Sequence, residues 1–396
     1  MKPGALLVGL LAAILALLVA HGRDSMYNNY VLLADAFVHG RIFIDSAWPG
    51  PRIDAVLFDG HRYVVNDPVP ALLLIPLVAL VHERANETVL ACLLFGVAAG
   101  AAWALLERLG VRTRDALWLL AFLVAGTDLL WCSMLGDVWF CAQTSAVAFL
   151  LLAMCELAGK GRGWLVALWI ALALGSRFTV VMALPVVAWW VWRGFLDQRE
   201  DDSAPSPPRV RSLAAFVAAL VPFFVLWIAY NEARWHVPWD AGHSIFYRQD
   251  PFLGGPTGGP FSLDNLGGEP YSFFVLPPEW NAKAHALVPP TEGTALWFTS
   301  PALLLALLAR SPRRLVLTLW IATMLVAGPS LLYYANGGAQ FGMRHALDFE
   351  PFLFVLMALA ARGGLALVWQ ALIGWSVAAG SWGIWYWNTV VRTGNL

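Results

Sequence analysis

Charged residues are scarce in this chain. They make up 13% of its 396 residues, against 59% that are hydrophobic, whereas a soluble domain carries about 25% charged residues. Composition therefore excludes a water-soluble globular domain. Short alternating strands of the outer-membrane type are also missing. Because lipid cannot satisfy open backbone groups, the apolar runs must be helices.

Several signatures of well-known sites are also missing. The four cysteines, Cys92, Cys132, Cys141 and Cys155, show no CxxC spacing, so they are interpreted as small buried residues, with a Cys132–Cys141 disulfide left open. The chain has no HExxH, Walker or GxSxG motif, and its histidines are not at metal-ligand spacing. The net charge of −1 gives no basic footprint for nucleic acid.

Long apolar runs recur along the whole sequence and are long enough to cross a hydrocarbon core of roughly 30 Å. They predict an all-α polytopic membrane protein, a single transmembrane domain over residues 1–396 with about ten or eleven spanning helices. The first run resembles a signal-peptide core with a weak cleavage site, but we interpret it as a retained helix because the remaining topology then works. The predicted spans are 5–20, 89–106, 116–131, 138–157, 164–175, 178–192, 213–230, 294–309, 315–334, 351–361 and 365–387.

Lysine and arginine concentrate in short loops, which the positive-inside rule places in the cytoplasm together with the N-terminus. A polar, Pro-containing stretch at 197–211 predicts a cytoplasmic linker. The less basic loops at 21–87 and 231–293 then face the periplasm or exterior of a bacterial plasma membrane. Val69–Val81 is apolar but too short to cross, so it predicts a juxtamembrane or re-entrant helix.

The first outer loop places a carboxylate where the first helix leaves the bilayer. Asp24 stands at that rim, and the pattern of residues 27–37 predicts a helix lying on the membrane surface. Asp35 follows Asp24 by eleven residues, three helical turns, and so lies on nearly the same face. A carboxylate here is either a solvated cap of the surface helix or a base beside the membrane.

Two arginines stand close to apolar runs. Arg177 interrupts ALWIALALGSRFTVVMALP, where a charge within a span costs roughly 2.5–3.5 kcal/mol, so it either serves a function or lies in an outer turn broken by Gly175-Ser176. Arg344 and His345 follow a Gly-rich turn at the head of a span, an arrangement suited to phosphate. The alternative for Arg344 is a local helix pair with Asp348. The loop 231–293 is rich in Gly and Pro (FLGGPTGGP), which favours a mobile lid.

An ordered set of short motifs resembles a known family. The chain has an N-terminal helix, then an outer loop that opens with Asp and Tyr and continues in a surface helix ending HG-R. NDPVPALLLIPLVALV, Asp137, YNEARWHVPWDAGH, WFTSPALLL and FGMRHALDFEPF follow. This order is similar to the GT-C superfamily of polytopic glycosyltransferases, and above all to its protein O-mannosyltransferase and aminoarabinose transferase group. One departure is Ser25, since the family usually carries an Asp-Glu pair where this chain has Asp24-Ser25.

The resemblance implies a GT-C-like bundle that moves a hexosyl or pentosyl group from a polyprenyl-phosphate donor to a glycan, lipid or protein acceptor. A lipid phosphate leaves without a protein acid, so one base and cationic stabilisation suffice. Asp24 is the expected base, acting with inversion, and Asp137 is a second carboxylate that orients the acceptor or holds a metal. Arg344, Arg177 and His345 are expected to bind the phosphate; Tyr27, Asp35, Asp67 and His243 are expected to contact the acceptor or sugar. No cofactor is certain, and Mg²⁺ or Mn²⁺ is left open.

Two other functions fit the same composition. A transporter or lipid flippase would also use buried arginines and rim carboxylates, although the sequence shows no internal repeat and few intramembrane ionisable groups. A non-catalytic relative could bind a lipid-linked sugar without turning it over. A transferase requires Asp24, Asp137 and Arg344 to converge on one outer cavity, whereas a transporter requires a polar path across the bilayer.

Overall fold

The computed structural model describes residues 2–44, 54–196, 209–249, 259–282, 285–335 and 337–391. Most of this part of the chain is helical. The α-helices are α1 (Pro3–Ala20), α2 (Asn29–Val38), α3 (Val69–Val81), α4 (Glu87–Arg108), α5 (Thr113–Ala125), α6 (Leu129–Leu135), α7 (Val138–Leu157), α8 (Gly163–Leu174), α9 (Leu184–Arg193), α10 (Val210–Trp235), α11 (His243–Gln249), α12 (Glu269–Phe274), α13 (Leu296–Thr299), α14 (Arg313–Leu332), α15 (Glu350–Ala360) and α16 (Leu367–Tyr386). The 3₁₀ segments used below are η2 (Phe178–Ala183), η4 (Pro301–Leu308) and η5 (Arg344–Asp348).

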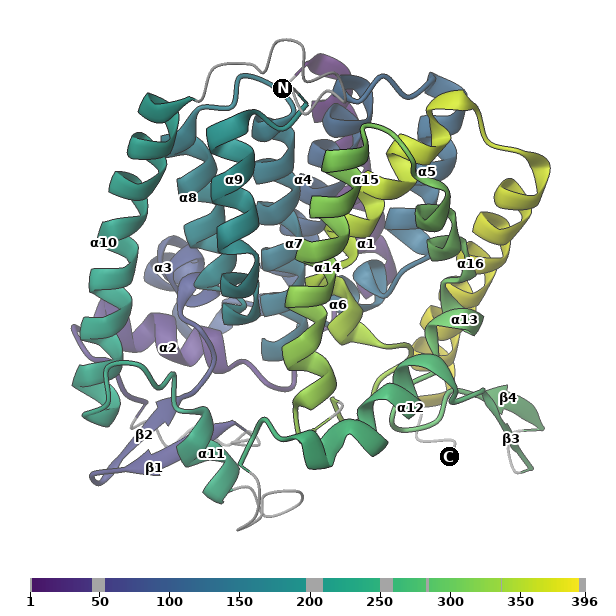
Figure 1. The fold of residues 1–396 in the computed structure, drawn as a ribbon. Coiled ribbons are helices and arrows are strands. Elements are labelled where there is room, and N and C mark those ends of the chain that lie inside the picture. The colour runs from purple at the N-terminus through teal and green to yellow at the C-terminus, as the bar shows by residue number, and fades with distance from the viewer. Residues whose placement is uncertain are drawn as a thin grey trace.

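The long helices stand side by side as a bundle (Figure 1). Five of them, α1, α4, α7, α10 and α14, are each long and apolar enough to cross a membrane, and the pair α5–α6, bent by 43°, makes up to six. The other predicted spans are also helical. The predicted all-α membrane fold is therefore confirmed.

Some predicted spans are shorter than the bilayer is thick. Helix α8 has 12 residues and α15 has 11, so at 1.5 Å per residue each is about 16–18 Å long. The predicted span at 178–192 divides into η2 and α9, and the one at 294–309 into α13 and η4. These elements leave room at one end of the bundle, and that room holds the cavity described below.

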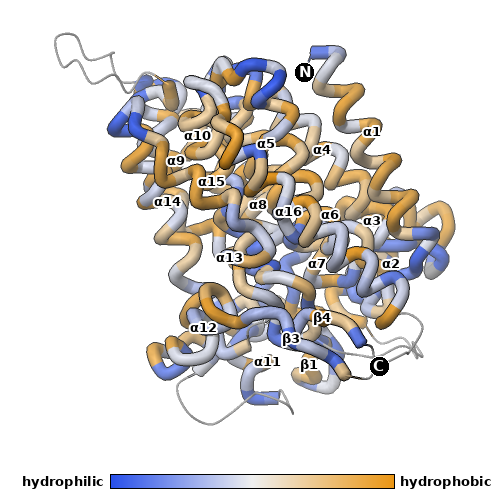
Figure 2. Tube along the Cα trace, turned by 90° about the vertical axis from the view of Figure 1, so that its right-hand side faces the viewer, coloured by the Kyte–Doolittle hydropathy of each residue, from blue (hydrophilic) through white to orange (hydrophobic). Residues whose placement is uncertain are grey.

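The long polar loops gather at one end of the bundle, as predicted. Helix α2, α11, α12 and two small hairpins lie together there, at the bottom of Figure 1, and the N-terminus lies at the other end. The hairpins are β1 (Ala55–Phe58) with β2 (His61–Val64), where Ala55 pairs with Val64, and β3 (Glu279–Asn281) with β4 (Ala286–Val288), where Glu279 pairs with Val288. Figure 2 shows apolar residues along the middle of the bundle and polar ones toward its ends.

Helix α2 lies across the end of the bundle (Figure 1) and is held there by a buried carboxylate. Glu87 Oε1, at the start of α4, accepts hydrogen bonds from the backbone N–H groups of Tyr30 (2.6 Å) and Val31 (3.1 Å). These are donors of the first turn of α2, which has no other cap in its own sequence. A negative charge at that helix end is favourable, so α4 fixes the juxtamembrane helix.

Small residues let α1 pack along α4. Gly96 of α4 faces Gly9 and Ala13 of α1 so closely that a Cβ on Gly96 would lie 2.5 Å from the Gly9 carbonyl oxygen. Such close backbone approach is a common way for helices to associate in lipid. The first apolar run therefore packs as a helix of the bundle.

Two expectations are wrong, and a third falls mostly on residues that the structure does not describe. Asp24 and Asp35 do not share a helix face, because α2 begins only at Asn29. The four cysteines are free and buried, so no disulfide joins Cys132 to Cys141. Most of the predicted linker, residues 197–208, lies outside the described residues, and α10 begins just after it.

Gly96→Ala is expected to lower the melting temperature of the detergent-solubilised protein, because the new Cβ would collide with Gly9. Overpacking of this kind costs about 1–3 kcal/mol. Gly374→Ala on α16 is the matched control, since a Cβ there meets nothing within 4 Å and alanine is the better helix former. Equal melting shifts of the two variants, followed by tryptophan fluorescence on heating, would contradict the close α1–α4 contact.

Candidate functional site

A cavity of about 1460 Å³ opens among the outer loops and the ends of the short helices. Its walls come from the segment before α2, the β1–β2 hairpin, the α6–α7 and α8–η2 turns, the segment from α10 to α11, the end of α14 and η5. Most of the residues selected from the sequence line it, namely Asp24, Tyr27, Asp67, Asp137, Arg177, His243, Arg344 and His345.

An ion pair beside the cavity joins the turn after α8 to η5. Arg177 Nη2 lies 2.8 Å from Asp348 Oδ2, and its Nε donates to both carboxylate oxygens at 3.1 and 3.2 Å. Asp348 is fully buried and also accepts from the Thr179 hydroxyl at 2.9 Å. The two partners are 171 residues apart in the sequence, so this pair locks the turn after α8 onto η5.

Arg344 is buried at the cavity wall and held by neutral groups. Its Nη2 donates to the Gly337 carbonyl at 3.1 Å, and its Nη1 lies 3.4 Å from Gln143 Oε1. The Gln143 amide also donates to the Arg344 carbonyl oxygen at 3.1 Å, and the Phe140 ring lies 5.3 Å from the guanidinium carbon. Among the described residues, Nε has no partner and no carboxylate lies within ion-pair distance. The predicted alternative, an Arg344–Asp348 pair, is therefore wrong, because Asp348 pairs with Arg177.

Two cations thus face one cavity. Burial and then the nearby charge of Arg177 lower the pKa of Arg344 to about 10, which still leaves it protonated at neutral pH. Since only Arg177 has a carboxylate at ion-pair distance among the described residues, the pair leaves an excess of positive charge that suits an anion.

Two carboxylates also line the cavity, near the loop between α1 and α2. Asp137 Oδ1 accepts from the Ser25 hydroxyl at 2.7 Å and the Met26 N–H at 3.1 Å, and burial raises the pKa of this carboxyl group. Asp24 is exposed, and its Oδ1 accepts from the Asn86 amide at 2.7 Å. The loop from α1 to α2 therefore wraps around Asp137 and presents Asp24 beside it.

Gly136 fixes the turn that carries Asp137. Its φ of +66° is in the left-handed region, and a Cβ there would lie 2.3 Å from the Cα of Thr88 at the start of α4. Only glycine fits this contact, because any other residue would be both strained and in collision. The position of Asp137 is thus set by α4.

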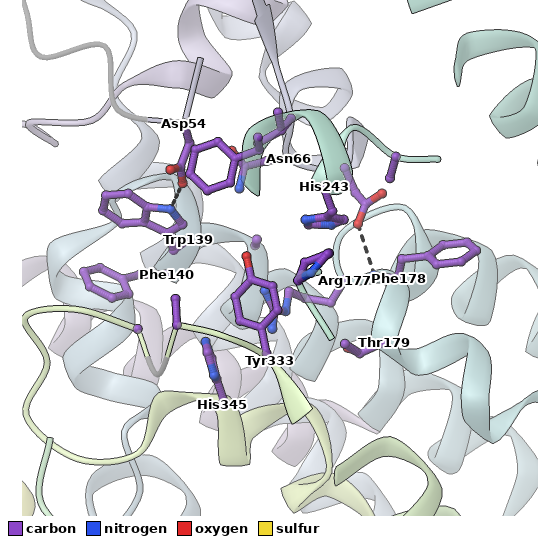
Figure 3. Close-up of a pocket in the computed structure, with 18 of the residues that line it drawn as sticks. Asp54, Asn66, Trp139, Phe140, Arg177, Phe178, Thr179, His243, Tyr333 and His345 are labelled. Atoms are coloured by element: carbon purple, nitrogen blue, oxygen red, sulfur yellow. Dashed lines mark hydrogen bonds between the residues drawn. The ribbon is translucent and has the colours of Figure 1, made fainter. Parts of the chain in front are cut away.

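Asp67 lies on the floor near Arg177. It accepts from the Phe178 N–H at 3.1 Å, an interaction drawn in Figure 3. Burial raises the pKa of Asp67 to about 6, although the charges of Arg234 and Arg177 oppose that rise. Asp67 therefore balances part of the positive charge on this side.

Tyr333 lies between two histidines that face the cavity (Figure 3). Its ring centroid is 6.4 Å from those of both His243 and His345. Burial, followed by the charge of Arg177, lowers the pKa of His243 to about 4, and burial lowers the pKa of His345 as well. Both imidazoles are therefore neutral at physiological pH and act as hydrogen-bonding groups.

Asp35 lies outside the cavity, contrary to its expected role. Its carboxylate lies 3.5 Å from His39 Nδ1 and 3.8 Å from Arg41 Nη2 on α2 and the turn that follows it. The reason is the separation of Asp24 from α2, which removes the shared helix face. Of the two interpretations for a carboxylate in this loop, Asp35 therefore fits the solvated residue of the surface helix.

The sequence did not single out several lining residues. Asp54 accepts a hydrogen bond from the Trp139 indole N–H, and Asn66, Ser330 and Tyr333 also face the cavity. Asn66 is the first residue of the NDPVPALLLIPLVALV motif and Tyr333 lies shortly before FGMRHALDFEPF, and this was the only available signal. Described parts of the loop 231–293, including Trp239 and Phe261, form one wall.

The carboxylates do not fit a tight metal site. Over the described ranges, no group of three or more His, Cys, Asp or Glu side chains is placed to hold an ion. One oxygen of Asp137 and one of Asp24 are already engaged by protein donors. No step below depends on a metal.

No family model matches this chain, and no curated protein matches it. Two solved structures are similar. One is ArnT from Cupriavidus metallidurans, bound to undecaprenyl phosphate, at 12% identity and a TM-score of 0.49, over 92% of this chain and 61% of that one. The other is the apo oligosaccharyltransferase of Archaeoglobus fulgidus, at 15% identity and a TM-score of 0.49, over 97% of this chain and 55% of that one.

The chain thus spans less than two thirds of the length of either structure.

Asp348→Ala is expected to destabilise the protein by about 3–5 kcal/mol, the usual cost of leaving one partner of a buried ion pair alone. The double variant Arg177→Met/Asp348→Leu is expected to recover much of this loss, because no charge is then left unpaired. Melting temperatures of the single and double variants in detergent test the coupling. A double variant as unstable as the two single losses added together would contradict it.

Proposed function

We propose that this multi-pass membrane protein is a glycosyltransferase that takes its sugar from a polyprenyl-phosphate donor and works at the outer membrane face. The observation that carries the proposal is Arg344, a buried guanidinium with an unpaired Nε, in the same cavity as the rim carboxylates Asp24 and Asp137. An anion-binding group facing a base is the pairing that this transfer requires.

The phosphate of the donor is assigned to the cationic wall. Arg344 has hydrogen-bonding capacity left over, and Arg177 lines the same cavity while Asp348 holds it in place. Guanidinium groups bind phosphate oxygens with strong charge-assisted hydrogen bonds. As the bond from phosphate to sugar breaks, negative charge grows on the departing phosphate, and these groups stabilise it.

Asp24 is assigned as the base for the acceptor hydroxyl. It is exposed to the cavity, and Asn86 orients it through one oxygen while leaving the other free. Asp137 is held by Ser25 and Met26 and would position the acceptor. We assign a direct in-line attack of the acceptor on the anomeric carbon, with the phosphate leaving from the other face, which inverts the anomeric centre.

The prenyl chain is assigned to lipid beside the cavity. Part of the cavity lining comes from membrane helices and is apolar, with Met182 near α9, Trp227 on α10 and Pro329 on α14. Trp227 stacks on Phe178 at a centroid distance of 4.3 Å. This wall suits a lipid whose headgroup alone enters the polar space.

Asp24→Asn is expected to lower the release of free polyprenyl phosphate from polyprenyl-phosphate sugars by 10²–10⁴-fold, the usual contribution of a general base. The assay uses detergent-purified protein with crude membrane glycans as acceptors. Asp35→Asn is the matched control, because it removes a carboxylate of the same loop outside the cavity, and it is expected to keep full activity. A fully active Asp24→Asn enzyme would refute the base assignment.

Arg344→Gln is expected to raise the Kd for the donor by roughly 10–100-fold, since hydrogen bonds to charged groups contribute about 1.5–3 kcal/mol. Arg248→Gln serves as control, because Arg248 is exposed on α11 and does not line the cavity. Donor affinity is measured by microscale thermophoresis. Unchanged donor affinity in Arg344→Gln would exclude this residue from the phosphate site.

A further inference from the structure

The cavity carries unused hydrogen-bonding groups beyond Arg344. Among the described residues, Asn66 Oδ1, His243 Nδ1, Ser330 Oγ and His345 Nδ1 line it, are buried, and have no hydrogen-bond partner. Native proteins leave few such atoms unsatisfied, and each one calls for an explanation. A polar ligand in the cavity explains all four together.

These groups fall on two sides of Tyr333. His345 is next to Arg344, on the side assigned to the phosphate. His243 lies on the other side of the Tyr333 ring, at 6.4 Å, and Asn66 lines the same cavity (Figure 3). Ser330 lies on α14, one turn before Tyr333. The uncharged groups Asn66, His243 and Ser330 thus come from three separate elements and border the space beyond the phosphate wall.

We propose that Asn66, His243 and Ser330 form a subsite for the hydroxyl groups of a neutral sugar, the sugar carried by the donor. This inference rests on the proposed function, because it takes the ligand at Arg344 to be a lipid-linked phosphate. It adds the class of sugar, a hexose or pentose without a charged substituent, and it gives a role to Asn66 and Ser330.

The chemistry of the three groups matches hydroxyls. An amide oxygen accepts, a hydroxyl donates and accepts, and a neutral imidazole does one at each nitrogen. Because burial and Arg177 keep the pKa of His243 at about 4, the subsite carries no charge of its own. A site built to bond a hydroxyl rejects an analogue that leaves its buried groups unpaired.

Among the described residues, the carboxylates beside this subsite already have protein partners, so an ammonium sugar would have to share them. The neighbouring Asp67 already accepts from the Phe178 N–H and is balanced by Arg234 and Arg177. Asp240 accepts from the Gly242 N–H at 2.8 Å. The positive charge of Arg177 would further disfavour an ammonium group placed here.

The test compares three kinds of probe in direct binding to the full-length purified protein. They are a polyprenyl phosphate without sugar, the polyprenyl phosphates of mannose, glucose and galactose, and those of glucosamine and galactosamine. We expect at least one neutral sugar donor to bind tenfold or more tightly than the sugarless lipid and than its amino counterpart.

His243→Leu and Asn66→Leu are then expected to weaken that donor by about tenfold, the effect of losing one hydrogen bond. Their affinity for the sugarless lipid should stay within twofold of the wild type. His243→Gln, which keeps a hydrogen-bonding side chain, should recover part of the loss. Melting temperatures establish that each variant is folded.

Two outcomes would overturn the subsite. Amino-sugar donors that bind as tightly as neutral ones would remove its selectivity, and equal weakening of the sugarless lipid would move the effect to the phosphate or the fold. Failure of the proposed function looks different. In that case Arg344→Gln would leave the binding of the sugarless polyprenyl phosphate unchanged.

Discussion

A backbone that leaves a helix within the bilayer must find its hydrogen-bond partners in protein or in a water-filled cavity. Much of this structure follows from that constraint. Helices α8 and α15 have only 12 and 11 residues, too few to cross a core of roughly 30 Å. The residues beside their outer ends, Ser176, Arg177, Arg344 and His345, line the cavity. Arg177 and Asp348 stand beside those ends and pair with each other. This ion pair joins the turn after α8 to η5.

The cavity separates charge by position. Guanidinium groups lie along one wall, where Asp348 neutralises Arg177 but no described carboxylate pairs with Arg344. Carboxylates lie on the rim, held by the loop between α1 and α2. Neutral imidazoles and the Tyr333 ring fill the space near the cationic wall. The cavity lining thus combines a cation suited to an anion, carboxylates and neutral hydrogen-bonding groups around one space, the kinds of group that the proposed transfer would use.

The first outer loop also accounts for the departure from the resembled family. Where that family usually has Glu, Ser25 donates its hydroxyl to Asp137 at 2.7 Å. A carboxylate at this position would repel Asp137 unless a proton or a cation lay between them. The serine therefore stabilises a lone Asp137 by a hydrogen bond. Glu87 holds the following helix α2 by its N-terminus, so α4 positions the whole loop.

The sequence by itself determined the class of fold, the side on which the polar loops gather and most of the cavity residues. Apolar run length and loop charge are local properties of the chain, and they govern how it inserts into a bilayer. It could not decide between partners for Arg344 and Arg177, since the choice of Asp348 for Arg177 joins residues 171 apart. It also misplaced Asp35, because the break before Asn29 that separates it from Asp24 depends on Glu87 capping α2. The groups around Tyr333 could be found only in the tertiary structure. They come from distant segments of the chain, and only the fold shows that their polar atoms are unpaired and line one cavity.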